Sequence, residues 1–70
     1  MQNVYLIECA DGRLVHDYTT LKDTIDVSFT KDLNYGMRFH TMKEVELIQA
    51  FLEVTHNLKS EVLILTESHH

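Results

Sequence analysis

Residues Thr41–Leu58, TMKEVELIQAFLEVTHNL, have the most regular hydrophobic period in the chain and predict its one long helix. At about 100° per residue, seven apolar side chains fall on one half of the helical wheel: Val45, Leu47, Ile48, Phe51, Leu52, Val54 and Leu58. This apolar arc is about 180° wide, well above the minimum of about 100° for a surface helix. We therefore expect the helix to contact more than one neighbour.

Capping residues mark both ends of this helix. Thr41 and Glu44 form a capping box, in which the Thr41 hydroxyl accepts the N–H of Glu44 and the Glu44 carboxylate can reach back to the N–H of Thr41. At the other end, Asn57 can take the left-handed conformation that ends many helices. Lys59 lies just beyond it, near the negative end of the helix dipole.

Three strands are predicted before the helix. Asn3–Cys9 is rich in β-branched and aromatic residues, and the following Asp11-Gly12 pair is a strong signal for a hairpin turn. Arg13–Thr19 is then the return strand. The alternation of apolar and polar residues in Ile25–Thr30 predicts the third strand.

The hairpin register decides which side chains face the core. Counting back from a two-residue turn places six side chains on one face, which we assign to the core: Cys9 opposite Leu14, Ile7 opposite His16, and Tyr5 opposite Tyr18. The other face carries Val4, Leu6, Glu8, Val15, Asp17 and Thr19. A one-residue bulge would reverse half of this assignment, and the sequence leaves that alternative open.

Two further segments complete the expected fold. Thr30–Gly36 is predicted as a single helical turn, with Leu33 packed inside and Gly36 at its end. Glu61–Thr66, EVLILT, is the final strand. Its apolar run suits an interior strand covered on both faces or an edge strand that needs a partner. We predict an α+β, two-layer domain in which a three- to four-stranded sheet packs on one main helix.

Length and composition limit the class of protein. Seventy residues make one domain with one small core. A single cysteine, Cys9, excludes an internal disulfide, so the cytoplasm is the expected compartment. No apolar run approaches the roughly 20 residues of a membrane helix, and Met1–Cys9 lacks the features of a signal peptide. We interpret residues 1–68 as the domain and His69 and His70 as a remnant of a purification tag.

The residues with catalytic or metal-binding chemistry show no functional spacing. The three internal histidines, His16, His40 and His56, form neither a CxxC-type nor an HExxH-type pattern with each other or with Cys9. Cys9 and His16 would stand diagonally across the hairpin, about 7–8 Å apart, with no third residue to orient the imidazole. We predict a buried structural cysteine, no metal, no cofactor and no enzymatic activity.

The acidic composition bears on nucleic-acid binding. Eleven acidic and six basic residues give a formal charge of −5, which disfavours a phosphate-binding surface. Four aromatic side chains could stack on bases, but we assign them to packing under the helix: Tyr5, Tyr18, Phe29 and Tyr35. Eight carboxylates could instead imitate the phosphates of DNA: Asp17, Asp23, Asp26, Asp32, Glu46, Glu53, Glu61 and Glu67.

The middle of the chain follows the pattern FT-x-DL, a short spacer, then RF-x-T-x-x-E-V-E-x-I. The residues that carry it are Phe29, Thr30, Asp32, Leu33, Arg38, Phe39, Thr41, Glu44, Val45, Glu46 and Ile48. With the strand-DG-strand opening and the final apolar strand, this resembles the small uncharacterised proteins encoded by phages and prophages of Gram-positive bacteria. Such proteins often carry Ala at the positions of Tyr35 and Val45. The resemblance implies a phage accessory protein of unknown activity and brings no catalytic residues with it.

We therefore expect a non-enzymatic, phage-type accessory protein that acts as a protein–protein interaction module. The alternative is an acidic inhibitor that mimics DNA and blocks a nucleic-acid-processing or host-defence enzyme. The helix and final strand hold more apolar surface than one small protomer can bury, which indicates a protein partner or a homodimer. The side chains expected at this interface are Leu47, Val54, Val62, Ile64 and Leu65.

Overall fold

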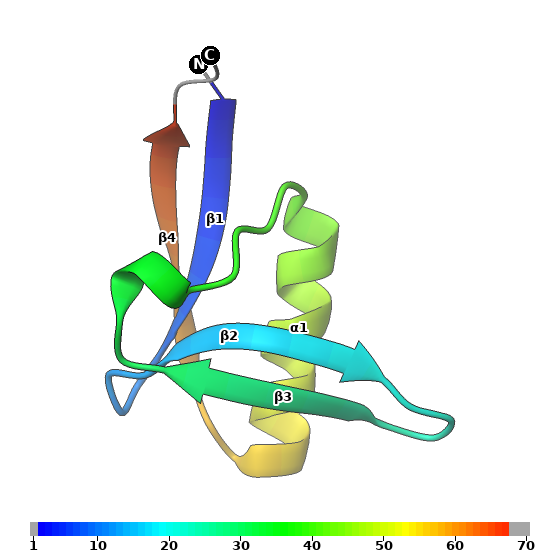
Figure 1. Cartoon of the computed structure of the whole chain (residues 1–70). Helices are drawn as coiled ribbons and strands as arrows, with labels where there is room; N and C mark the ends of the chain where they lie inside the picture. Colours follow the sequence, from blue (N-terminus) through cyan, green and yellow to red (C-terminus); the bar gives the residue numbers. More distant parts are fainter. Residues whose placement is uncertain (1, 68–70) are drawn as a thin grey trace.

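In the computed structural model, which describes residues 2–67, a four-stranded antiparallel sheet packs with one main helix (Figure 1). The strands follow the order β3-β2-β1-β4 across the sheet and comprise β1 (Gln2–Cys9), β2 (Leu14–Thr20), β3 (Ile25–Thr30) and β4 (Ser60–Glu67). A short 3-10 turn, η1 (Leu33–Tyr35), and the helix α1 (Met42–His56) lie between β3 and β4 in sequence. This is the predicted α+β architecture. The interpretation of His69 and His70 lies outside the described residues.

The ends of α1 follow from its capping residues. Thr41 has an extended backbone, and its hydroxyl accepts the N–H of Glu44 at 3.3 Å. The Glu44 carboxylate accepts a hydrogen bond from the Tyr18 hydroxyl of β2, which ties the start of the helix to the sheet. Asn57 ends the helix in the left-handed conformation, with φ 51°. The predicted caps at Thr41 and Asn57 are thus confirmed.

The sheet consists of two antiparallel ribbons that cross at a steep angle (Figure 1). β1 pairs with β4 over its whole length, whereas β1 and β2 are paired only at Glu8↔Leu14. Beyond that pair the ribbons diverge, and the chain before α1 lies in the opening. There Phe39 forms an antiparallel bridge with Tyr5, and the Met37 N–H donates to the Val15 carbonyl at 2.8 Å.

The predicted hairpin register is wrong by one residue. The Gly12 N–H donates to the Cys9 carbonyl, and the Cys9 N–H donates to the Arg13 carbonyl, which closes a three-residue loop. Gly12 has φ +89°, a conformation that glycine adopts without strain. Leu14 therefore lies opposite Glu8, not Cys9, and turns to the outer face.

A β-bulge in β2 then changes the pattern again. The register with β3 shifts between Val15 and Asp17, which leaves His16 as the extra residue. Because of the bulge, Val15 and Tyr18 both face α1 although they are three residues apart. The assignment of His16 to the core and of Val15 to the other face is therefore wrong, and Leu14 is buried as expected but faces away from α1. His16 is exposed, and its Nδ1 donates to the Tyr35 carbonyl at 2.7 Å.

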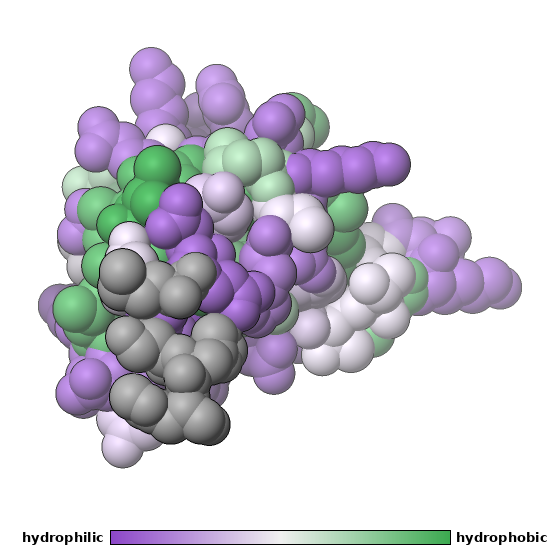
Figure 2. Space-filling model, turned by 90° about the horizontal axis from the view of Figure 1, so that it is seen from above, coloured by the Kyte–Doolittle hydropathy of each residue, from purple (hydrophilic) through white to green (hydrophobic). Residues whose placement is uncertain are grey.

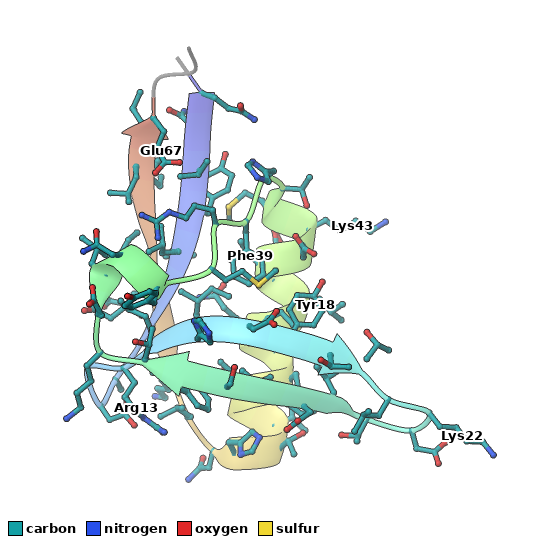
Figure 3. The ribbon with its side chains drawn as sticks, viewed as in Figure 1. Arg13, Tyr18, Lys22, Phe39, Lys43 and Glu67 are labelled. Atoms are coloured by element: carbon teal, nitrogen blue, oxygen red, sulfur yellow. The ribbon has the colours of Figure 1, made fainter. Side chains whose placement is uncertain are left out.

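The main core lies between the sheet and α1. Its buried side chains come from β1, β2, α1 and the segment between the ribbons: Ile7, Cys9, Val15, Phe39, Val45, Ile48 and Leu52. Phe39 is labelled between β1 and α1 in Figure 3, and its ring stacks on that of Tyr18 with centroids 6.2 Å apart. Apolar burial of this kind contributes about 1.5–3 kcal/mol for each large side chain.

A second, smaller cluster covers the outer face of β1. It contains Val4, Leu6 and Leu14, with Leu63 and Leu65 of β4 packed against it. Gly36 approaches this face so closely that a Cβ atom would lie 2.7 Å from Leu6 Cδ2. Val4 and Leu6, which the predicted register places on the face away from the core, are therefore buried as well. The expected packing of Leu33 inside its turn is wrong, because the Leu33 side chain is exposed.

Candidate interaction surface at the open edge of β4

β4 is an edge strand of the sheet: β1 lies on one side of it, and within residues 2–67 no strand lies on the other (Figure 1). It is eight residues long and pairs with β1 without a break in register. The unpaired N–H and C=O groups of such a strand are a template for another chain. Seen from above, apolar atoms gather on the side where β4 lies in Figure 1 (Figure 2).

The backbone groups that point to the open edge can be assigned from β1. The N–H and C=O of Tyr5 both bond to Phe39, each at 2.8 Å, on the side away from β4. Tyr5↔Ile64 is therefore a non-hydrogen-bonded pair of the β1–β4 ladder. The N–H and C=O of Ile64 thus point to the open edge, and the alternation of the ladder gives the same direction to those of Val62 and Thr66.

The three predicted interface residues of β4 differ in exposure. Val62 is half-buried and packs against the main core beneath α1. Leu65, also half-buried, packs against the outer cluster. Ile64 lies on the same face of the strand as Val62, but its side chain is 64% exposed. Ile64 is therefore the residue at which an exposed apolar side chain and outward-pointing backbone groups coincide.

The two predicted interface residues of α1 lie on a separate surface. Leu47 is 57% exposed and Val54 is 85% exposed. Gln49 Nε2 donates to the Ser60 carbonyl at 3.3 Å, so the Gln49 side of the helix faces β4. At 100° per residue, Leu47 and Val54 project roughly 160° and 140° away from Gln49. The structure therefore does not bring them together with Ile64.

Two hollows flank the Ser60 end of β4. One has a volume of about 610 Å³ and is lined by Glu8, Cys9, Ala10, Gly12, Lys59, Ser60 and Glu61. The other has a volume of about 360 Å³ and is lined by Glu46, Gln49, Ala50, Glu53, Lys59 and Ser60. They share Lys59 and Ser60, and four glutamates line one or the other of them. We call these four residues the acidic end of β4: Glu8, Glu46, Glu53 and Glu61.

Two carboxylates of the acidic end face each other across the sheet. Glu8 and Glu61 are directly opposite in the β1–β4 ladder, on the outer face. Like charges in this position destabilise a sheet, so the pair costs stability in the isolated protein. At the far end of β4, by contrast, Glu67 forms an ion pair with Arg38 at 3.4 Å. The same guanidinium donates to the carbonyls of Leu33 and Gly36, which hold it in place.

The structure separates the residues considered for catalysis. Cys9 is buried, and its burial, followed by the nearby Asp11 carboxylate, raises the pKa of the thiol. His16 is exposed on the bulge of β2 and bonds to Tyr35.

Within residues 2–67, no group of three or more His, Cys, Asp or Glu side chains is placed to hold a metal ion. In the same range, no helix has the length and apolarity needed to cross a membrane.

Three of the four aromatic side chains considered for base stacking pack against the main core: Tyr5, Tyr18 and Phe29. The guanidinium of Arg13 also covers the Phe29 ring, 4.2 Å from its centroid. Tyr35 is an exception, because its side chain is 63% exposed beside His16. The assignment of Tyr35 to packing under the helix is therefore wrong.

Comparison with protein-family models, curated proteins and solved structures gives no match to this chain. The function therefore has to be inferred from the geometry of its own residues.

Proposed function

We propose that this chain is a non-enzymatic accessory protein that binds another protein through the open edge of β4. The observation that carries the proposal is Ile64, where an exposed apolar side chain and unpaired backbone groups meet at the middle of an edge strand. Natural sheets protect such edges with prolines, bulges or central charges. β4 has no proline and no register break, and its carboxylates, Glu61 and Glu67, lie near its two ends.

Strand addition is the binding mode that this edge supports. An extended segment beside β4 would bond to the outward groups of Val62, Ile64 and Thr66, and side chains next to Ile64 would supply specificity. The resemblance to phage and prophage proteins supports a partner from the host cell or the phage, met in the cytoplasm. A second copy of this chain is another occupant of the same edge, as a homodimer.

A pull-down from the lysate of a Gram-positive host tests this proposal. Wild-type protein is compared with Ile64→Lys, which places a charge at the open edge, and with Val54→Lys, which places one on the outer face of α1. We expect wild type and Val54→Lys to retain the same protein and Ile64→Lys to lose it. Capture of the same proteins by all three, or loss with Val54→Lys alone, would contradict binding through β4.

The acidic end of β4 supports a second candidate, an acidic inhibitor that occupies the DNA groove of a nucleic-acid-processing or host-defence enzyme. Four glutamates and one lysine line the two hollows and give this end a net negative charge, the sign of the phosphates of DNA. A DNA mimic would lose its partner steeply with added salt and in competition with duplex DNA. An apolar strand interface would resist both treatments.

A further inference from the structure

The acidic end of β4 presents carboxylates on both faces of the sheet. Glu46 and Glu53 of α1 line the hollow on the helix side. Glu8 and Glu61 lie opposite each other in the ladder on the outer side, where Leu6 and Leu63 continue the same face. A strand placed against the open edge would therefore meet negative charge above and below its backbone at this one end.

The other positions along the edge are apolar or already neutralised. Val62 and Ile64 face the helix side, and Leu63 and Leu65 face the outer side. At the far end, the carboxylate of Glu67 is paired with Arg38. The two ends of the edge therefore differ in charge: the Ser60 end is negative, whereas at the other end the charge of Glu67 is balanced by Arg38.

An added strand can match both faces with two consecutive residues. Successive side chains of a strand point to opposite faces, so two adjacent cations would reach Glu46 and Glu53 on one face and Glu61 on the other. In an antiparallel arrangement, which is the commoner pairing, the C-terminal end of the added strand lies beside Ser60. The preceding residues would then lie beside Ile64 and need to be apolar.

We infer that the open edge of β4 binds an extended segment of a partner protein as an antiparallel fifth strand, with apolar residues at its centre and two adjacent basic residues at its C-terminal end. This inference rests on the proposed function and specifies its partner by chemistry. The two basic residues offset the Glu8–Glu61 repulsion and the negative charge of Glu46 and Glu53, so the charge of the segment complements that of the edge.

A second copy of the chain is less well matched to the edge than a basic segment. An antiparallel pair of β4 strands centred on Ile64 would place Glu61 opposite Glu67 of the other copy. It would also bring together two chains that each carry a formal charge of −5. Glu67 is already paired with Arg38, so it brings no positive charge to Glu61, and the net charges of the two copies repel each other, which favours the basic segment.

Hydrogen exchange with a synthetic peptide tests the inference. The probe is acetyl-Thr-Val-Ile-Val-Thr-Lys-Lys-amide, and the control has the same residues in reverse order. In the free protein at low concentration, the amides of Val62, Ile64 and Thr66 should exchange quickly, whereas those of Leu63 and Leu65 are held by β1 and exchange slowly. The probe should slow the exchange of the first three amides, and the reversed peptide should bind about tenfold more weakly.

Two matched double variants test the charges. Glu46→Gln/Glu53→Gln should weaken the binding of the probe peptide about fivefold, the size expected from the loss of two exposed ion pairs. Asp23→Asn/Asp26→Asn makes the same change in net charge on the β2–β3 hairpin, away from β4, and should leave binding unchanged. Equal effects of the two variants, equal binding of the two peptides, or no protection of Ile64 would each overturn the inference.

The outcomes also separate this inference from the proposed function. If the edge amides become protected as the concentration of protein alone rises, a second copy occupies the edge and the basic segment is wrong, while binding through β4 stands. If the probe peptide does not bind, but the Ile64→Lys variant no longer captures a partner that wild type captures, the edge binds a segment of other chemistry. If a captured partner leaves the exchange of Ile64 unchanged, the proposed function itself fails.

Discussion

The two edge strands of the sheet, β3 and β4, hold equivalent positions but present different surfaces. β3 alternates strictly: Ile25, Val27 and Phe29 pack against the main core, and the residues between them are polar. Its partner β2 carries a bulge, and the charged Asp26 is the second residue of β3. β4 instead has four consecutive apolar residues, and one of them is exposed. By this comparison β3 is the protected edge, and β4 is the edge on which we propose that a partner binds.

The largest expected effect comes from placing a lysine in each edge strand. Val27→Lys forces a charge against the main core and should lower the free energy of unfolding by about 2 kcal/mol or more. Ile64→Lys changes a side chain that is 64% exposed and should cost less than about 0.5 kcal/mol. Urea unfolding of both variants measures the difference. Equal destabilisation would mean that Ile64 is covered in the folded protein.

The two faces of β4 provide the next test. Leu65→Lys removes a half-buried side chain from the outer cluster with Val4, Leu6 and Leu14, so we expect a loss of about 1–2 kcal/mol. Ile64→Lys is its matched control on the adjacent residue. Circular dichroism and urea midpoints should show a weakened fold for Leu65→Lys alone. An unchanged midpoint for both variants would indicate that the outer cluster contributes nothing to stability.

The helix start links α1 to the β2–β3 ribbon and not to β4. Thr41→Ala removes the hydroxyl that accepts the Glu44 N–H and should cost about 1 kcal/mol, the usual effect of losing an N-cap. Thr41→Ser, which keeps the hydroxyl, is the control and should stay close to wild type. If alanine and serine behave alike, Thr41 is not acting as the cap.

The smallest effect is a pH dependence on the β2 side of the helix. The hydrogen bond to the Glu44 carboxylate, with burial, raises the pKa of Tyr18 above its usual value near 10. The neutral hydroxyl is thus favoured in the folded state, so its contribution is complete below pH 10 and is lost as the pH rises through the higher folded-state pKa. Tyr18→Phe should remove this part of the alkaline loss. An identical alkaline profile for the variant would contradict it.

Local signals in the sequence predicted the elements of this fold, because caps and alternation act within a few residues. Thr41 and Asn57 fix the helix, and the strands begin and end within about two residues of their predicted limits, the usual uncertainty. The register was not predictable in this way. Asp11-Gly12 suits a two-residue or a three-residue loop, and only contacts with β3 and the outer cluster select the loop and the bulge at His16.

The candidate site was predictable only in part, because the exposure of its residues also depends on contacts between distant parts of the chain. The apolar run of β4 indicated an interface, but the sequence could not show which of its residues remain exposed. Leu65 packs against the outer cluster, which Gly36 approaches at Leu6, whereas the Ile64 side chain is 64% exposed. The acidic end likewise depends on the packing of α1 beside Ser60, since its four carboxylates are widely spaced along the chain.

The pairing of β1 with β4 also governs the kinetics of folding. This ladder joins residues 2–9 to residues 60–67, so its closure encloses every other element in one loop. Long-range pairing of this kind is slow, because the entropy of closing the loop is lost before the contacts form. Until β4 docks, β1 has an open edge of its own and part of the core remains uncovered. We therefore expect β4 to join late, so that a destabilising change in β4 acts mainly by speeding unfolding.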